Sequence, residues 1–100
     1  MYAIAVLRYR KPIADVEAAT DDHRAYLKTL HAQGLLLASG PMVPRNGGVL
    51  LFRVPDADAN ATLDKLRDAD PFVTRGIAQY EFIPWAPGLG LAGLDGLKAP

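Results

Sequence analysis

One histidine stands inside the apolar pattern of a predicted helix. His23 shares a helical face with Val16, Ala19, Leu27 and Leu30. An imidazole is the usual proton acceptor in catalysis near neutral pH, and it needs a partner that fixes its tautomer. A histidine on an apolar face can equally be a core residue whose ring nitrogen is satisfied by a backbone carbonyl. The residues alone leave both interpretations open.

A partner for His23 must come from outside its own helix. The positions three and four residues away carry no carboxylate, and the side chain of the adjacent Asp22 diverges from the imidazole. Asp70, which precedes Pro71, is the best external candidate. An Asp-Pro pair is typical of a helix start, and a carboxylate that caps a helix can still accept from an imidazole N–H. The spacing permits a His23–Asp70 pair, with a purely capping Asp70 as the alternative.

Ser39 adds a hydroxyl to this set. Together with His23 and Asp70 it completes the residue types of a hydrolytic triad, but the G-x-S-x-G elbow is absent. We therefore expect Ser39 to donate a hydrogen bond and not to act as a nucleophile. Gly40 and Pro41 end its strand and are expected to line a cleft.

Six residues in all are expected to surround a ligand. Arg8 and Tyr80 stand on predicted strands and suit an anionic or phenolic group, with solvation and ordinary packing as the alternatives. The complete set is Arg8, Ser39, Gly40, Pro41, Phe72 and Tyr80.

A metal site is not expected. His31 is the only other histidine, and eight helical residues place it about 80° around and about 12 Å along the axis from His23. The chain has no cysteine, so thiolate ligands and disulfides are excluded. His31 is predicted to act as a cation at a helix C-terminus. No phosphate loop or dinucleotide fingerprint occurs, and we predict no cofactor.

The composition is that of one ordinary globular domain. The chain has 100 residues, 50% of them hydrophobic, with 11 basic and 11 acidic side chains. Zero net charge disfavours binding to nucleic acid or anionic lipid. The N-terminus lacks a signal-peptide pattern, and no apolar run approaches the roughly 20 residues that span a bilayer. We expect a cytoplasmic protein whose partners include neither nucleic acid nor a membrane.

The elements that must position these residues alternate along the chain. The helix that carries His23 is predicted from Asp15, as N-cap, to residue 32, with Gly34 as its stop. A second helix is predicted from Asp58 or Asn60 to residue 69, with Ala61 in its apolar set, before a short turn at residues 70–75. Strands are predicted at residues 2–9, 35–43, 49–54 and 77–85, with an Asn-Gly turn of positive φ in the hairpin. The β-α-β-β-α-β order predicts an α+β, ferredoxin-like split βαβ fold with an antiparallel four-stranded sheet.

The predicted strands are apolar on both faces. Two helices cover one face of such a sheet, so something else must cover the other. The simplest cover is the sheet of a second copy, which predicts a homodimer and a dimeric α+β barrel. The alternative is the Gly/Leu-rich segment 88–100, which we expect to be an irregular tail outside the folded domain at residues 1–87.

Three stretches carry more specific motifs: MYAIAVLRYRKP, DHRAYLKTLHAQGLLLASGPMVPRNGGVLLFRV and DADPFVTRGIAQYEFIPW. They contain a helical histidine followed by Tyr-Leu, a G-x-x-x-x-S-G-P strand and a D-P-F turn, all in order. Over residues 1–85 the chain resembles the YciI-like (YCII-related) family. The segment after Pro87 is outside this resemblance.

The resemblance implies a ferredoxin-like fold that dimerises through its sheets and is related to muconolactone isomerases. It also implies an active site built on a His–Asp pair, which corresponds to His23 and Asp70. Assigned activity in the family is a cofactor-free dehydrochlorination of an aromatic-degradation intermediate. We therefore predict a small lyase or isomerase in which His23 is general base or acid and Asp70 orients it. The alternatives are a non-catalytic ligand-binding or partner-interaction dimer, in which His23 is structural, and an oxygenase or isomerase that uses the same cleft differently.

Overall fold

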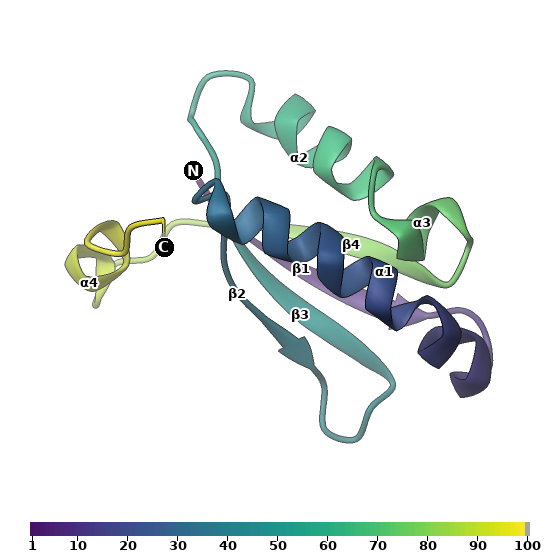
Figure 1. Cartoon of the computed structure of the whole chain (residues 1–100). Helices are drawn as coiled ribbons and strands as arrows, with labels where there is room; N and C mark the ends of the chain where they lie inside the picture. The colour runs from purple at the N-terminus through teal and green to yellow at the C-terminus, as the bar shows by residue number, and fades with distance from the viewer. Residues whose placement is uncertain (100) are drawn as a thin grey trace.

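The structure is a computed structural model that describes residues 1–99, and its elements follow the predicted order (Figure 1). Its four strands form one antiparallel sheet in the order β2-β3-β1-β4. The predicted ferredoxin-like α+β fold is therefore confirmed. The elements are β1 (Tyr2–Tyr9), α1 (Ile13–Ala32), β2 (Leu36–Pro41), β3 (Gly47–Arg53), α2 (Ala59–Asp68), α3 (Pro71–Thr74), β4 (Ala78–Trp85) and α4 (Leu91–Asp95).

Helices α1, α2 and α3 lie on the same face of the sheet (Figure 1). Side chains alternate between the two faces of a strand, and in β1 the buried set points toward the helices. Ala3, Ala5 and Leu7 are at most 1% exposed, and Phe52 of β3 is completely buried beside them. The hydrophobic core therefore fills the space between this face and the helices. None of the helices in residues 1–99 is both long and apolar enough to cross a membrane.

Helix α1 begins earlier than predicted. Pro12 occupies the cap position, no side chain caps the helix, and Asp15 lies within the first turn. The first turn is exposed, so water can satisfy its free N–H groups and no polar cap is needed. The prediction that Gly34 ends this helix is confirmed. Gly34 has φ of +78°, and the N–H of Leu35 donates to the carbonyl of Leu30 at 3.0 Å.

Helix α2 begins after Asp58, one of its two predicted caps, but without a capping side chain. Asp58 occupies the cap position but has a left-handed backbone with φ of 56°, and its side chain makes no capping bond. A capping residue normally has an extended backbone, which lets its side chain accept from an N–H group of the first helical turn. The left-handed backbone of Asp58 does not provide this geometry. Asn60 lies inside the helix. Ala59 and Leu63 are buried whereas Ala61 is exposed, so its predicted place in the apolar set is wrong.

A β-bulge in β2 decides which residues of this strand face the helices. Leu36 pairs with Phe52, but the next regular partners are Ala38 with Leu51, so Leu37 is an extra residue. The insertion shifts the alternation by one. Ser39 consequently pairs with the core residue Leu50 and faces the helix layer. No feature of the sequence indicated this shift.

The hairpin between β2 and β3 requires Gly47 for a different reason than predicted. Its φ is not positive, and it is the first residue of β3 rather than the corner of a turn. A Cβ atom at this position would stand 2.0 Å from the backbone oxygen of Leu7. Gly47 is therefore needed for the close approach of two strands.

The second face of the sheet is apolar and open. Val49 and Ile83 are 41% and 42% exposed, and Trp85 is 41% exposed. The register of the strands places Ile4, Val6 and Leu51 on the same face. We refer to these six residues as the open face.

The C-terminal tail reaches one end of the open face. The segment expected to be irregular contains the short helix α4, which lies beyond the strand ends in Figure 1. The guanidinium of Arg53 donates to the carbonyls of Leu94 and Leu97 at 2.8 and 2.6 Å, and the Tyr2 hydroxyl donates to Asp95 at 2.7 Å. Val49 and Ile83 stay exposed, so residues 88–99 do not provide the cover that the alternative required.

Replacement of Gly47 tests the close approach of β3 to β1. We expect Gly47→Ala to lower the free energy of unfolding by about 1–3 kcal/mol, because the new methyl group meets backbone. Gly40→Ala is the matched control, since a Cβ there has no neighbour within 4 Å. Urea unfolding of both variants checks this, and equal stabilities would contradict it.

Candidate active site

The centre of the candidate site is a buried contact between α1 and the start of α3. His23 is 8% exposed, Asp70 is completely buried, and the imidazole Nδ1 lies 2.8 Å from the carboxylate Oδ1. An ionised carboxylate only accepts hydrogen bonds, so Nδ1 carries the proton and donates it. Nε2 is then the free nitrogen of the neutral ring, and it is the atom available to accept a proton.

Asp70 is satisfied by three donors from three elements. Besides the imidazole, Oδ1 accepts from the backbone N–H of Phe72 at 2.8 Å, and Oδ2 accepts from the hydroxyl of Tyr80. The bond from the N–H of Phe72 is the predicted N-cap of α3, with Pro71 in the first turn. Capping and pairing therefore coexist on one carboxylate, and a third group holds its other oxygen.

The ring of His23 is also held by stacking. Phe72 lies parallel to the imidazole, with ring centroids 3.8 Å apart and an interplanar angle of 3°. Tyr9 meets the same phenyl ring edge-on, with centroids 6.2 Å apart. One side of the imidazole is thus closed to water, and its orientation is fixed by both the carboxylate and the phenyl ring.

Tyr80 belongs to the support of the dyad. Burial raises the pKa of its phenol far above the ordinary range, and the negative charge of Asp70 and the hydrogen bond to it act in the same direction. Tyr80 is therefore a protonated hydroxyl near neutral pH and donates a hydrogen bond to Asp70.

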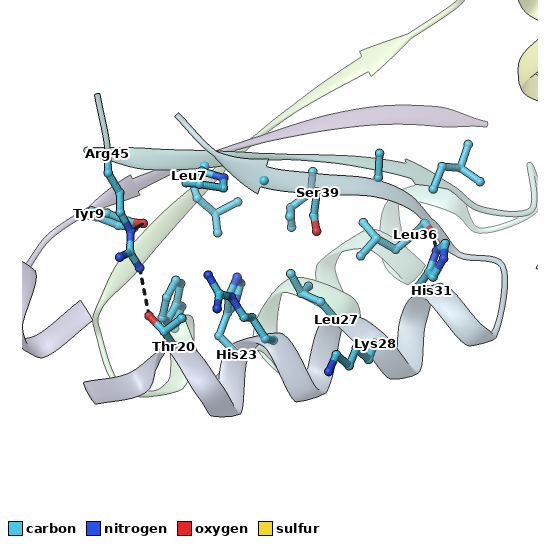
Figure 2. A pocket seen from close by; sticks show the side chains of 18 residues that line it. Leu7, Tyr9, Thr20, His23, Leu27, Lys28, His31, Leu36, Ser39 and Arg45 are labelled. Atoms are coloured by element: carbon cyan, nitrogen blue, oxygen red, sulfur yellow. Dashed lines mark hydrogen bonds between the residues drawn. The ribbon is translucent and has the colours of Figure 1, made fainter. Parts of the chain in front are cut away.

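A cavity of about 460 Å³ opens between α1 and strands β2 and β3, and His23 lies on its wall. Figure 2 shows Arg45 at one end, His23 near the middle and His31 at the other end. The Ser39 side chain projects from β2 toward α1, as the bulge requires. Apolar residues form much of the remaining wall, among them Leu7, Leu27, Leu36 and Leu50. Such a volume and lining suit a small organic molecule.

The structure gathers most of the predicted site residues. Ser39, Gly40, Pro41 and Phe72 line the same cavity as His23. Tyr80 lies behind the wall and reaches Asp70 instead of the cavity. Arg8 is not brought to the site, because alternation along β1 turns it to the opposite face, where it is exposed and 4.0 Å from Glu81.

Several wall residues escaped sequence reasoning. Those on α1 are spaced three or four residues apart, so the helical period alone could have found Thr20, Arg24, Lys28 and His31 as one stripe, which lies next to His23. His31, predicted as a terminal cation, lies 2.8 Å through Nδ1 from the carbonyl of Leu36 and lines the far end of the cavity. Tyr9 follows Ala5 and Leu7 at the strand period of two, so alternation could have placed it on the helix side, whereas Arg45 had no such signal because it lies in the hairpin between β2 and β3.

The arrangement supports proton transfer at Nε2. A carboxylate behind Nδ1 stabilises the imidazolium that forms when Nε2 accepts a proton. No hydrogen bond joins Ser39 to His23 within residues 1–99, so the three residue types do not form a connected triad there. In the same range no group of three or more His, Cys, Asp or Glu side chains is placed to hold a metal ion.

Fold and site together define a ferredoxin-like α+β domain with a buried His–Asp pair beside a small-molecule cavity. The YCII-related domain model matches residues 2–86, and the chain belongs to this family. No sequence among the curated proteins matches the chain significantly. Among solved structures, it is similar to 5-chloro-2-hydroxyhydroquinone dehydrochlorinase from Burkholderia phenoliruptrix AC1100, determined in complex with 2,5-dihydroxybenzoquinone. The TM-score is 0.72 with 19% identity over 89% of this chain and 97% of that one, a likeness that establishes the fold.

The raised pKa of Tyr80 predicts a pH-dependent stability. Because the unfolded phenol ionises near pH 10 and the folded one does not, the unfolded state binds fewer protons above about pH 10. The stabilisation by Tyr80 is therefore complete below about pH 10 and is lost as the pH rises beyond it. At pH 8 we expect Tyr80→Phe to cost about 1.5–3 kcal/mol, the value of a hydrogen bond to a charged group.

Urea unfolding of both proteins from pH 8 to 11 measures this difference. The advantage of the unaltered protein over Tyr80→Phe should shrink by up to about 1.4 kcal/mol per pH unit above pH 10. A difference that stays constant over the whole range would show that Tyr80 ionises equally in both states.

Proposed function

We propose that this protein is a small enzyme that transfers a proton on a compact polar or aromatic molecule without a cofactor, in a lyase- or isomerase-type reaction. The observation that carries the proposal is that His23, paired with the buried Asp70, lies on the wall of the 460 Å³ cavity. The similarity to a dehydrochlorinase in fold agrees with this class of reaction. The cavity can hold a small substrate, and the free Nε2 of His23 can accept its proton.

The reaction begins when Nε2 of His23 accepts a proton from an acidic C–H or O–H of the substrate. The imidazolium donates through Nδ1 to Asp70, whose buried charge stabilises it. In an HX elimination, the electron pair of the broken C–H bond forms a double bond and the halide leaves with the pair of the C–X bond. In an isomerisation, the same proton returns from Nε2 to another atom. A positioned proton transfer of this kind contributes about 10²–10⁴-fold in rate.

Substitution of the dyad tests this mechanism. With 5-chloro-2-hydroxyhydroquinone as the substrate, we expect His23→Gln and Asp70→Asn each to lower kcat/KM by about 10²–10⁴-fold, because one removes the base and the other its orientation. Chloride release measures the rate. Asp68→Asn is the matched control, since Asp68 is exposed and pairs with Arg67 away from the cavity.

The alternative role gives a different result in the same assay. A protein that binds 2,5-dihydroxybenzoquinone but releases no chloride would favour a non-catalytic ligand-binding dimer. Full activity of His23→Gln would contradict proton transfer by the imidazole.

The proposed enzyme is a homodimer that buries the open face. Ile83 and Trp85 of β4 and Val49 of β3 are each more than 40% exposed, an apolar surface that a second copy of the same sheet would cover about a two-fold axis. The cavity lies on the helix side of the sheet, so it stays accessible in such a dimer. Packing of the two open faces gives the barrel-like core expected from the apolar strands.

A charge on the open face should separate the two copies. We expect Val49→Glu and Ile83→Glu to convert the dimer into a monomer, because a buried unpaired carboxylate opposes association. Light scattering after gel filtration gives the molar mass. Val43→Glu is the control, since Val43 is 97% exposed in the hairpin and should leave the dimer intact. A monomeric unaltered protein, or dimeric variants, would contradict the proposed interface.

A further inference from the structure

The charged side chains on the cavity wall all have the same sign. The wall carries Arg24, Lys28 and Arg45, and among the residues that the structure describes it includes no aspartate or glutamate. The chain as a whole has equal numbers of basic and acidic residues, so this distribution is local. A concave site lined by one sign of charge concentrates ligands of the opposite sign. The cavity therefore selects for negative charge.

Arg45 is the best placed of these cations. Its Nη2 donates to the hydroxyl of Thr20 at 3.2 Å and its Nε to the hydroxyl of Tyr9 at 3.4 Å (Figure 2 draws the first). Thr20 in turn donates to the carbonyl of Val16 at 2.7 Å, which leaves its oxygen free to accept from the guanidinium. Neutral hydroxyls thus position a full positive charge without neutralising it.

Among the residues that the structure describes, no carboxylate pairs with this guanidinium. Within residues 1–99, no aspartate or glutamate oxygen lies within 4.0 Å of Arg45, whereas Arg53 is held by carbonyls and Arg67 and Arg75 have acidic partners. A guanidinium has five N–H donors, and Arg45 uses two of them. The remaining donors match the two oxygens of a carboxylate, or one phenolate or enolate oxygen.

Thr20, which accepts a hydrogen bond from Arg45, lies about one helical turn from His23. Thr20 and His23 are three residues apart on the cavity face of α1, which places their Cβ atoms about 5–6 Å apart. A molecule whose oxyanion contacts Arg45 therefore has its body beside Nε2 of His23. Leu7 and Leu50 supply an apolar surface under that body.

We propose that the ligand of this cavity is a small organic oxyanion, a carboxylate or an enolate such as a phenolate, with a compact apolar body. Arg45 binds the oxyanion, and Arg24 and Lys28 add to the attractive field. The proposal rests on the proposed function, because it takes the face of His23 as the reacting one. During proton abstraction, the same guanidinium stabilises negative charge that develops on an oxygen conjugated to the reacting carbon.

Paired anionic and neutral ligands with a single six-membered ring test the requirement for charge. Benzoate is compared with benzamide, and ionised 2,5-dihydroxybenzoquinone with neutral 1,4-hydroquinone, in NMR titrations at pH 7.5. We expect each anion to bind at least about 10-fold more tightly than its neutral counterpart, with shifts at His23, Ser39 and Arg45. Equal affinities, or shifts elsewhere on the molecule, would overturn the proposal. Phosphate that binds as tightly as benzoate would overturn the part played by the apolar body.

Substitution of the guanidinium assigns the contact. We expect Arg45→Gln to raise the Kd of both anions by about 10- to 100-fold, the equivalent of one or two charged hydrogen bonds, and to leave the neutral ligands unaffected. Arg45→Lys should recover part of the loss. Arg10→Gln is the matched control, because Arg10 is exposed and outside the cavity wall. An unchanged Kd in Arg45→Gln would overturn the assignment.

These measurements separate the ligand class from the reaction. His23→Gln should bind benzoate within a few-fold of the unaltered protein while it loses turnover. Anion binding that depends on Arg45, together with full turnover of His23→Gln, would refute the proposed mechanism alone. Turnover that depends on His23, with no preference for anions, would refute the ligand class alone.

Discussion

The site depends on the hydrogen bonds that the carboxylate of Asp70 accepts. It is completely buried, and its hydrogen bonds come from α1 through His23, from α3 through the backbone of Phe72 and from β4 through Tyr80. A buried charge left without its donors costs several kcal/mol, so these three elements are required to meet at one point. Loss of any one donor would leave the others around a poorly satisfied charge. The pair of His23 and Asp70 is therefore part of the fold as well as of the candidate site.

The two faces of the sheet differ in what they present. On the helix side, the charge of Asp70 fixes the tautomer of His23 and leaves Nε2 free, while a stacked Phe72 excludes water from one side of the ring. The cavity on this side has an apolar floor and a basic wall, which together suit an organic anion. On the opposite side, the open face carries apolar residues and no part of the cavity. Association through it would leave the site unobstructed.

Most elements of the fold could be predicted from local patterns. The period of the apolar residues in α1, the Gly34 stop and the Asp70-Pro71 start of α3 depend on neighbouring residues, and the structure agrees with all three. The start of α1 at Ile13 was misplaced, because an exposed helix start does not require a side-chain cap, whereas α2 begins after Asp58, one of its two predicted caps. The need for Gly47 was recognised for the wrong reason, since the close oxygen of Leu7 comes from a strand that is distant in sequence.

The sequence by itself determined the order of elements, the family motifs and the candidate pair of His23 and Asp70, since these depend on residue type and local spacing. Only the tertiary structure decided which residues join the pair. Sheet pairing turned Arg8 to the opposite face, the bulge at Leu37 turned Ser39 inward, and the hairpin brought Arg45 to Thr20. The faces of Arg8 and Ser39 depend on strand alternation and on the register between strands, since a shift of one residue reverses the face on which a side chain lies. That register is set by contacts across the sheet, which no local stretch of sequence contains.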